Sequence, residues 1–231
     1  MEIDSRVKYL NKLIREKSVL FLLVPFLSGI LFMMIRYGKG PSHLIINKWN
    51  SEVADTFFKY MTHLGDGAIF AVIIIVLAFV RFRWALYELL AALMTLIFVF
   101  IAKQLIFKGM PRPTKYFEDT EVLHLVEGVK MHAWNSFPSG HTITAFAIFM
   151  ILVLVVKNNY LKFIFTLIAI LAGYSRVYLS QHFLGDVFSG AIIGSLIAVF
   201  SCTIVDNLKI FNKAAWIDMN LLALFEKKHE Q

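Results

Sequence analysis

Hydrophobic residues along the chain are grouped into long runs that are separated by short polar segments. Six of these runs approach the roughly 20 residues that a membrane-spanning helix needs. They are 19–35, 57–80, 84–107, 142–156, 161–179 and 183–205. Two runs are weaker, because His63 and Gly65-Asp66-Gly67 interrupt the second and because the fourth is short. The pattern predicts an all-α fold, a bundle of six transmembrane helices.

The composition agrees with a protein that is surrounded by a lipid bilayer. Of the 231 residues, 58% are hydrophobic and 17% are charged, whereas soluble domains are about 45–50% apolar. Six spans use most of such a chain, so we expect a single domain over 1–231. The net charge of +7 could indicate nucleic acid, but the basic residues lie in short clusters between the apolar runs. We therefore expect a lipid bilayer and no nucleic acid as partner.

Basic residues beside the spans predict how the chain crosses the membrane. They are concentrated before the first run, between the second and third, and between the fourth and fifth, and such segments stay in the cytoplasm. The N-terminal segment 1–18 and the tail 207–231 are then cytoplasmic, whereas 36–56, 108–141 and 180–182 face outward. No small-residue cleavage site follows the first run. We expect a multi-pass protein of the inner (cytoplasmic) membrane, with these three segments facing the periplasm or exterior.

Three further features affect the interpretation of single segments. The tail 207–231 carries apolar residues at helical spacing, which fits an amphipathic helix on the membrane surface and equally a partly ordered tail. The acidic and histidine residues of 115–134 match no zinc or calcium spacing, so we expect this loop to cap a site instead of holding a metal. Glu88, inside the third run, is expected to reach toward the cytoplasmic surface.

Polar residues gather at three places that this topology puts at the outer membrane surface. The three clusters are Lys103 to Arg112-Pro113, Pro138-Ser139-Gly140-His141, and Ser175-Arg176 with His182 and Asp186. Charged residues at the end of a span commonly anchor it at the interface. Anchoring does not explain why a histidine begins the fourth run and a His-x-x-x-Asp begins the sixth. Together, the three clusters indicate a functional site.

The residue types in these clusters suit phosphate chemistry. On a helix, His182 and Asp186 share a face, so the carboxylate can orient the imidazole as a nucleophile or base. His141 stands where the chain turns into a helix, and the first N–H groups of a helix can bind an anion. Arg112 and Arg176 offer planar forks of donors that match phosphate oxygens. The set therefore contains a nucleophile, an acid and a cradle for an anion.

Two complete motifs make the chain resemble the type-2 phosphatidic acid phosphatase family, which shares its active-site pattern with the vanadium haloperoxidases. One motif is Pro-Ser-Gly-His at 138–141. The other is Ser175-Arg176, followed after five residues by His182 and after three more by Asp186. The likeness covers about 19–205, and it implies a six-helix bundle with its active site at the extracytoplasmic membrane surface.

The resemblance implies a metal-independent lipid phosphatase that works through a phosphohistidine intermediate. His182 would attack phosphorus, Asp186 would hold its ring, and His141 would protonate the leaving lipid oxygen. The phosphoryl oxygens would be bound by Lys103, Arg112, Ser139, Gly140 and Arg176. Positioned cations would supply much of the catalysis, because charge spreads over these oxygens in the transition state. The implied partner is a phosphorylated membrane lipid, with no cofactor, no metal and no required protein partner.

The first motif departs from the family pattern, which has six residues between its lysine and Arg-Pro. Eight residues separate Lys103 from Arg112, and three separate Lys108 from it. On an unbroken helix nine positions turn a side chain to the opposite face, but Gly109 and Pro111 can break the helix and reset that phase. Lys103, which lies on the span, is preferred to Lys108.

Two other classes of protein are weaker alternatives. An intramembrane serine hydrolase could use Ser139 as nucleophile and His141 or His182 as base, but it would leave both arginines unexplained. A transporter could carry charged residues at its span ends, but its binding site is expected near the midplane. The lipid itself stays open among undecaprenyl pyrophosphate, phosphatidylglycerophosphate, phosphatidic acid and lipid A phosphate, because each presents a phosphate beside acyl or prenyl chains.

Overall fold

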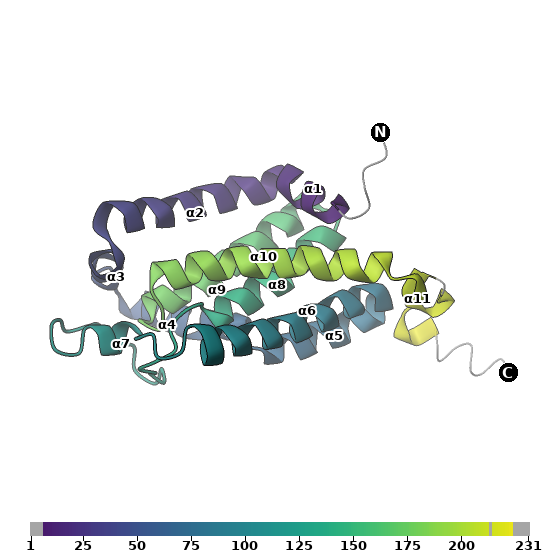
Figure 1. Ribbon diagram of the computed structural model, residues 1–231. Helices are drawn as coiled ribbons and strands as arrows, with labels where there is room; N and C mark the ends of the chain where they lie inside the picture. The colour runs from purple at the N-terminus through teal and green to yellow at the C-terminus, as the bar shows by residue number, and fades with distance from the viewer. Residues whose placement is uncertain (1–6, 213, 224–231) are drawn as a thin grey trace.

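The computed structural model describes residues 7–212 and 214–223, and this part of the chain is all-helical (Figure 1). The long helices are α2 (Lys17–Tyr37), α5 (Ala68–Val80), α6 (Phe82–Ile101), α8 (Gly140–Val155), α9 (Asn159–Tyr178) and α10 (Leu184–Asn207). The shorter elements are α1 (Lys8–Arg15), α3 (Lys39–Asn47), α4 (Glu52–Met61), η1 (Thr62–Gly65), η2 (Ala102–Ile106), α7 (Pro113–Tyr116), α11 (Lys209–Asn212) and η3 (Ala215–Asp218). The all-α prediction is confirmed for the described residues.

Several helices are long and apolar enough to cross a membrane, as expected of a multi-pass membrane protein. They are α2, the continuous α6 and η2, α9, and α10. A fifth crossing results if α4 with η1 and α5, which are bent by 64° at the break between them, count as one span. The apolar helix α8 has 16 residues. The two weaker runs, 57–80 and 142–156, are therefore those that do not form straight spans of full length, and the count of six stays a prediction.

The short helix α8 lies at the centre of the bundle. All its residues from Thr142 to Leu154 are buried, and α8 packs most extensively against α10 and α9. A Cβ atom on Gly194 of α10 would lie 2.5 Å from the carbonyl oxygen of Ile143. Helices in lipid associate through such close backbone approach at small residues. This packing fixes the start of α8 beside the start of α10, where the two predicted histidines lie.

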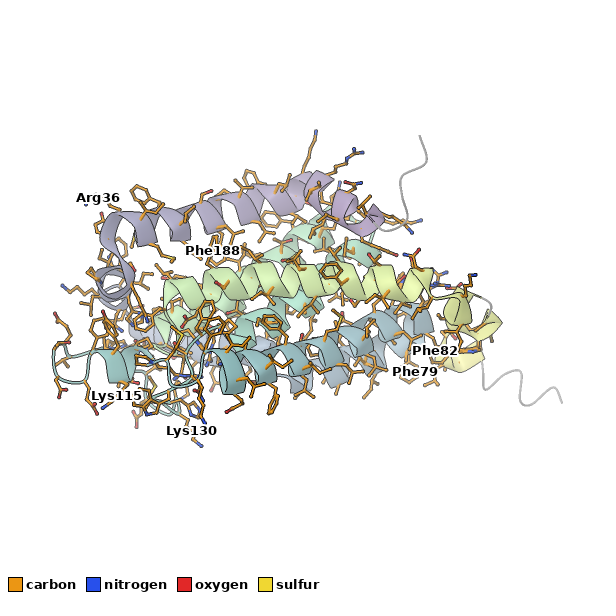
Figure 2. The ribbon with its side chains drawn as sticks, in the orientation of Figure 1. Arg36, Phe79, Phe82, Lys115, Lys130 and Phe188 are labelled. Atoms are coloured by element: carbon orange, nitrogen blue, oxygen red, sulfur yellow. The ribbon has the colours of Figure 1, made fainter. Side chains whose placement is uncertain are left out.

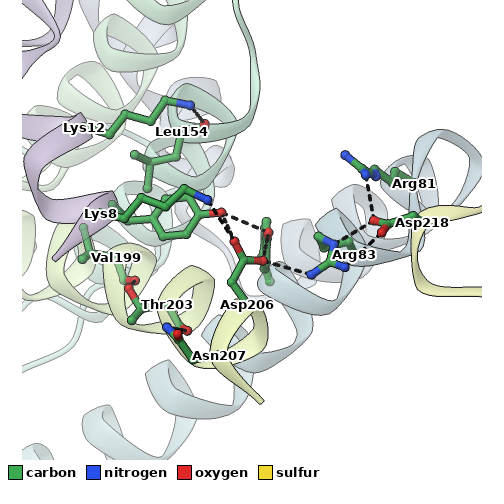
Figure 3. A network of polar contacts seen from close by, with 12 residues as sticks. Lys8, Lys12, Arg81, Arg83, Leu154, Val199, Thr203, Asp206, Asn207 and Asp218 are labelled. Carbon is green, nitrogen blue, oxygen red and sulfur yellow. Dashed lines mark hydrogen bonds and ion pairs between the residues drawn. The ribbon is translucent and has the colours of Figure 1, made fainter. Parts of the chain in front are cut away.

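A polar network joins distant parts of the chain at the end of the bundle that holds both termini (Figures 1 and 3). Asp206 of α10 accepts hydrogen bonds from the hydroxyls of Tyr9 and Tyr87, both at 2.5 Å, and from Arg83 at 3.1 Å. Arg83 also donates to Asp218 of η3 at 2.7 Å. The network thereby connects α1, α6, α10 and the tail. Both ends of the described chain therefore lie at the same end of the bundle.

The long loop after η2 lies at the other end of the bundle. Figure 2 shows Lys115 and Lys130 of this loop at one end of the molecule and Phe79 at the end of α5 and Phe82 at the start of α6 toward the other. The long loop and the connection between α5 and α6 therefore lie at opposite ends of the fold.

One expectation about a single segment, that for Glu88, is wrong. The described part of the tail forms two short helical segments, α11 and η3, and the backbone N–H of Phe82 donates to the carbonyl of Met219 at 2.9 Å. Residues 213 and 224–231 of the tail lie outside the described part. Glu88 does not reach the surface: it shares the buried stripe of α6 with Ala91 and Thr95 and is fully buried. Among the described residues, neither of its carboxyl oxygens has a hydrogen-bond partner.

Candidate active site

A cavity of about 780 Å³ lies between η1, α6, α8 and α9 and is closed on one side by part of the long loop. Of the eight residues that the sequence places in a site, six line this cavity. They are Lys103, Arg112, Gly140, His141, Arg176 and His182. The other two, Ser139 and Asp186, are buried directly behind the wall. The structure therefore brings together residues from three motifs that are more than 80 positions apart at their extremes.

His182 lies in the tight connection between α9 and α10. The backbone N–H groups of Gln181 and His182 both donate to the carbonyl of Arg176, at 2.9 and 3.0 Å, which curls the connection back over the end of α9. The ring nitrogen Nδ1 of His182 lies 3.2 Å from Oδ2 of Asp186. Since Nδ1 is engaged by the carboxylate, Nε2 is the nitrogen that remains for chemistry.

The charge state of His182 follows from its surroundings. Its side chain is almost fully buried, and the cations of Arg112, Lys103 and Arg176 lie nearby. Burial, reinforced by these positive charges, holds the pKa of His182 well below its usual range. The imidazole is therefore neutral near pH 7, with a lone pair on the nitrogen that does not face Asp186.

Asp186 is itself fixed by several donors. Its Oδ2 atom accepts hydrogen bonds from the hydroxyl of Ser136 at 2.5 Å and from the backbone N–H of Phe183 at 3.1 Å. Its backbone carbonyl accepts from the N–H of Ser139 at 3.2 Å. These bonds tie the start of α10 to the start of α8, so the carboxylate holds the His182 ring at a fixed angle.

The cations of the cavity are held by neutral groups. Nη1 of Arg112 donates to both the carbonyl and Oε1 of Gln181 at 3.2 Å, and Nη2 of Arg176 reaches the same Oε1 at 3.4 Å. Arg176 also donates to the hydroxyl of Thr62 at 2.5 Å, and Lys103 donates to the carbonyl of Asn135 at 3.1 Å. Within the described chain, none of the three cations forms an ion pair with a carboxylate. Their positive charge therefore remains available to an anion in the cavity.

The backbone at Lys103 accounts for part of the unusual spacing in the first motif. Residues Ala102–Ile106 form a π-helical turn, which accommodates an extra residue relative to an α-helix. Gly109 then adopts a φ of +79°, which reverses the chain toward Arg112. Lys103 lines the cavity together with Arg112. This placement supports Lys103 over Lys108 as the lysine of the motif.

Ser139 is placed differently from the other candidates. Its hydroxyl accepts hydrogen bonds from the N–H of Thr142 at 3.4 Å and from the Thr142 hydroxyl at 2.8 Å, and its side chain is fully buried. It therefore caps α8. The next two residues, Gly140 and His141, turn into the cavity at the start of that helix.

The connection that carries His182 is supported from α3. His43 lies 3.1 Å from the hydroxyl of Ser180, and the Asn47 side chain donates to that hydroxyl at 3.1 Å. Ser180 has a φ of +51°, a conformation that non-glycine residues seldom adopt without such support. Burial lowers the pKa of His43 to about 4, so this histidine is neutral at physiological pH. We infer that α3 stabilises the connection between α9 and α10 that carries His182.

The loop 115–134 contributes to the cavity wall, as the capping prediction expects. The lining residues from this loop are Gly128, Val129, Lys130 and His132. His124 instead lies 3.0 Å from Asp55 of α4, which fastens the loop to the bundle. The loop therefore forms part of the same cavity wall as Arg112 and Arg176.

Sequence reasoning missed several residues of the site. Gln181, which holds Arg112 and Arg176 together, directly precedes His182 but belongs to neither complete motif. Ser136 and Asn135 precede the second motif and contact Asp186 and Lys103 across the fold, which no local spacing reveals. Asp66, discussed below, had one visible signal, the polar interruption of the run 57–80.

The fold and the site together define a multi-pass membrane protein in which two histidines line a cavity at one end of a helical bundle, together with three cations that form no ion pair with a carboxylate of the described residues. The family model of the PAP2 superfamily matches residues 84–210. The chain therefore belongs to the PAP2 superfamily, in agreement with the resemblance that its motifs show.

Three relatives extend this comparison. Lipid phosphate phosphatase 1 of Arabidopsis thaliana is 31% identical in a match that covers 57% of this chain and 51% of that protein; the chain thus spans about half its length. The crystal structure of Aquifex aeolicus LpxE superposes with a TM-score of 0.61 at 32% identity, over 69% of this chain and 91% of that one. A PAP2-type phosphatidylglycerolphosphate phosphatase from Bacillus subtilis shares the fold, with a TM-score of 0.53 at 22% identity over 85% and 98% of the two chains.

Proposed function

We propose that this protein is an integral-membrane lipid phosphatase in which His182 is the nucleophile and no metal takes part. The observation that carries the proposal is the pairing of a buried, neutral His182 with Asp186 beside three cations that lack carboxylate partners. The names of the relatives, a lipid phosphate phosphatase and a phosphatidylglycerolphosphate phosphatase, support the same class.

The first half of the reaction forms a phosphoenzyme. Nε2 of His182 attacks phosphorus in line, and the bond from phosphorus to the lipid oxygen breaks as the new N–P bond forms. His141 gives a proton to the departing lipid oxygen, which leaves as an alcohol or a lipid phosphate. Lys103, Arg112 and Arg176 bind the phosphoryl oxygens, whose spread charge they stabilise without reorganising.

The second half releases phosphate. A water molecule attacks the phosphohistidine, neutral His141 accepts the proton of that water, and the N–P bond returns its electron pair to His182. Both histidines then have their starting protonation states. The helix-start N–H groups at Gly140 add to the anion site, with Ser139 acting through the cap that shapes this turn.

The shape of the cavity supports a lipid substrate. Beside its cationic end, the cavity has apolar walls from α5 and α6, among them Phe70, Leu96 and Val99. A phosphate can reach the cations while an acyl or prenyl chain lies along these walls or in the surrounding bilayer. Ser139 is less suited to nucleophilic attack, because its hydroxyl lies within the α8 cap and outside the cavity wall.

The first prediction concerns this activity. Purified protein in detergent is expected to release phosphate from at least one of undecaprenyl pyrophosphate, phosphatidylglycerophosphate, phosphatidic acid and lipid A phosphate, with full activity in excess chelator. Vanadate is expected to inhibit, because it can adopt a five-coordinate form that resembles phosphorus under attack. Activity that chelator removes and magnesium or zinc restores would instead indicate a metal enzyme.

We also propose that the chain crosses the membrane six times and that the site faces outward. The clusters of basic residues before α2 and between α5 and α6, together with the position of both termini at one end of the bundle, support this orientation. In this arrangement α4, η1 and α5 form one bent crossing, and α8 forms a short crossing that other helices enclose.

The second prediction tests the orientation by cysteine labelling. After Cys202→Ala, a Thr120→Cys variant is expected to react with an impermeant thiol reagent on intact spheroplasts, and an Asn159→Cys variant is expected to react only after lysis. Both positions are exposed. Asn159 is chosen because the side chain of its neighbour Asn158 caps α9. The reverse pattern of labelling would place the site in the cytoplasm.

A further inference from the structure

The break in the second apolar run has no role in the chemistry described so far. η1 ends at Gly65 and α5 begins at Ala68, and the helices on either side are bent by 64°. Gly65 lies against the start of α8: a Cβ atom there would be 2.7 Å from the carbonyl oxygen of His141. The bend and the glycine together bring Asp66 next to His141.

Asp66 bridges two histidines at this break. Its Oδ1 atom lies 2.7 Å from Nε2 of His141, and its Oδ2 atom lies 2.8 Å from Nδ1 of His63. The side chain of His63 is 64% exposed, that of Asp66 is 40% exposed and that of His141 is 34% exposed. All three line the cavity. Each carboxylate oxygen is therefore committed to one imidazole, which fixes the orientation of the carboxylate.

The charges around His141 determine how the Asp66 carboxylate affects the protonation of its ring. Arg176 of α9 and Lys103 of η2 both act on His141 as like charges when its ring carries a proton, and His182 lies close by before α10. Asp66 and its partner His63 face the ring from the break between α4 and α5. Among the described residues, Asp66 is the carboxylate within hydrogen-bonding distance of His141. Burial is the largest influence against the imidazolium form of His141, the two like charges add to it, and Asp66 opposes both.

We propose that Asp66 is a positioning residue that orients the His141 ring through Nε2 and favours its charged, proton-donating form when a lipid phosphate is bound. This inference rests on the proposed function, in which His141 protonates the leaving lipid oxygen. Asp66 accepts the Nε2–H bond of His141, so the proton given to the leaving oxygen is the one on Nδ1. As the bond between phosphorus and lipid oxygen breaks, the oxygen takes that proton and His141 becomes neutral; water returns a proton to Nδ1 when it attacks the phosphohistidine.

The role predicts a dependence on the leaving group. An alkoxide is a poor leaving group and needs the proton, whereas 4-nitrophenolate is stable as an anion and leaves without one. Asp66→Asn keeps the size of the side chain and removes its charge. We expect it to lower kcat for dioctanoyl phosphatidic acid by about 10- to 100-fold and kcat for 4-nitrophenyl phosphate by less than about 3-fold, since a general acid contributes roughly 10²–10⁴.

Two further variants complete the design. Asp66→Glu keeps the carboxylate and is expected to restore much of the ratio between the two substrates. Asp55→Asn is the matched control, because Asp55, from the same bent segment, also pairs with a histidine, His124 of the long loop at 3.0 Å, but does not contact His141; it is expected to leave the ratio unchanged. Because each ratio compares two substrates on one protein preparation, a smaller folded fraction cancels.

The pH profile gives a second readout that a merely structural role would not produce. Without the carboxylate the imidazolium form of His141 is less stable, so the basic limb of the kcat profile for the lipid is expected to move to lower pH in Asp66→Asn. Equal losses on both substrates, or an unchanged ratio and pH profile, would overturn the inference. Absence of phosphate release by the wild-type protein, or full activity of a variant lacking His182, would instead overturn the proposed function and is distinguishable from either result.

Discussion

His182→Ala is expected to reduce phosphate release below detection, because it removes the atom that forms the covalent bond to phosphorus. Loss of a nucleophile typically lowers kcat by about a thousandfold or more. Asp186→Asn is expected to leave a small remainder, since an asparagine oxygen can still accept some of the hydrogen bonds from Ser136, Phe183 and the His182 ring. The order of residual activities, with Asp186→Asn above His182→Ala, is measured as phosphate release in detergent.

A suitable control for this pair is His124→Ala. His124 belongs to the long loop, bonds to Asp55 and does not line the cavity. This variant tests whether removing any imidazole from the long loop lowers activity by disturbing the fold. Near-normal turnover by His182→Ala, or an equal loss in His124→Ala, would contradict the assignment of His182 as nucleophile.

The parts of the site that the sequence predicted share one property, which is that their geometry is local. His182 directly precedes the N-cap of α10 and Asp186 lies in the first turn of that helix, so their contact forms within one short segment of the chain. The start of α8 at Gly140 follows from the Pro-Ser-Gly sequence and a capping serine. The geometry of such motifs depends on residues that are close in sequence, so it can be predicted without knowing the rest of the fold.

The parts that were missed depend on contacts between distant segments. Ser136 reaches Asp186 across 50 positions, and Asp66 reaches His141 across 75. Glu88 was misjudged because an acidic residue in an apolar run suggests an exit to water, whereas the packing of α6 turns that face inward. The π-helical turn at Lys103 is a feature of the backbone that no particular residue type marks. The sequence could therefore indicate the lysine, but not the turn that orients its side chain.

The helices were predicted well where bilayer thickness determines their length. They were predicted less well where packing against other helices determines it. α2, α6, α9 and α10 have surfaces that the rest of the described protein leaves uncovered, and each has the length that a bilayer requires. The central helix α8 is enclosed by its neighbours, so burial against protein, not bilayer thickness, stabilises its 16 residues. The bend between η1 and α5 lies against the start of α8, so contact with protein also shapes this segment.

Gly194→Leu is expected to be the most destabilising single substitution among the glycines of the long helices, and Gly29→Leu is its matched control. At Gly194 an added Cβ atom meets the Ile143 carbonyl oxygen at 2.5 Å and the Cβ of Phe146 at 2.7 Å, whereas at Gly29 of α2 nothing lies within 4 Å. Both residues are helical, so intrinsic helix propensity favours leucine equally at the two sites. Any difference between the variants therefore reports on packing.

The expected loss at Gly194 is large because the atoms that must move are backbone atoms. Overpacking a rigid contact costs about 1–3 kcal/mol, and a whole leucine side chain between α8 and α10 belongs at or above roughly 3 kcal/mol. Because α8 carries His141 and α10 carries Asp186, activity is expected to fall together with stability. The midpoint of thermal unfolding in detergent should drop clearly for Gly194→Leu and stay equal or rise for Gly29→Leu; equal midpoints would mean that the close approach of α8 and α10 does not hold the bundle together.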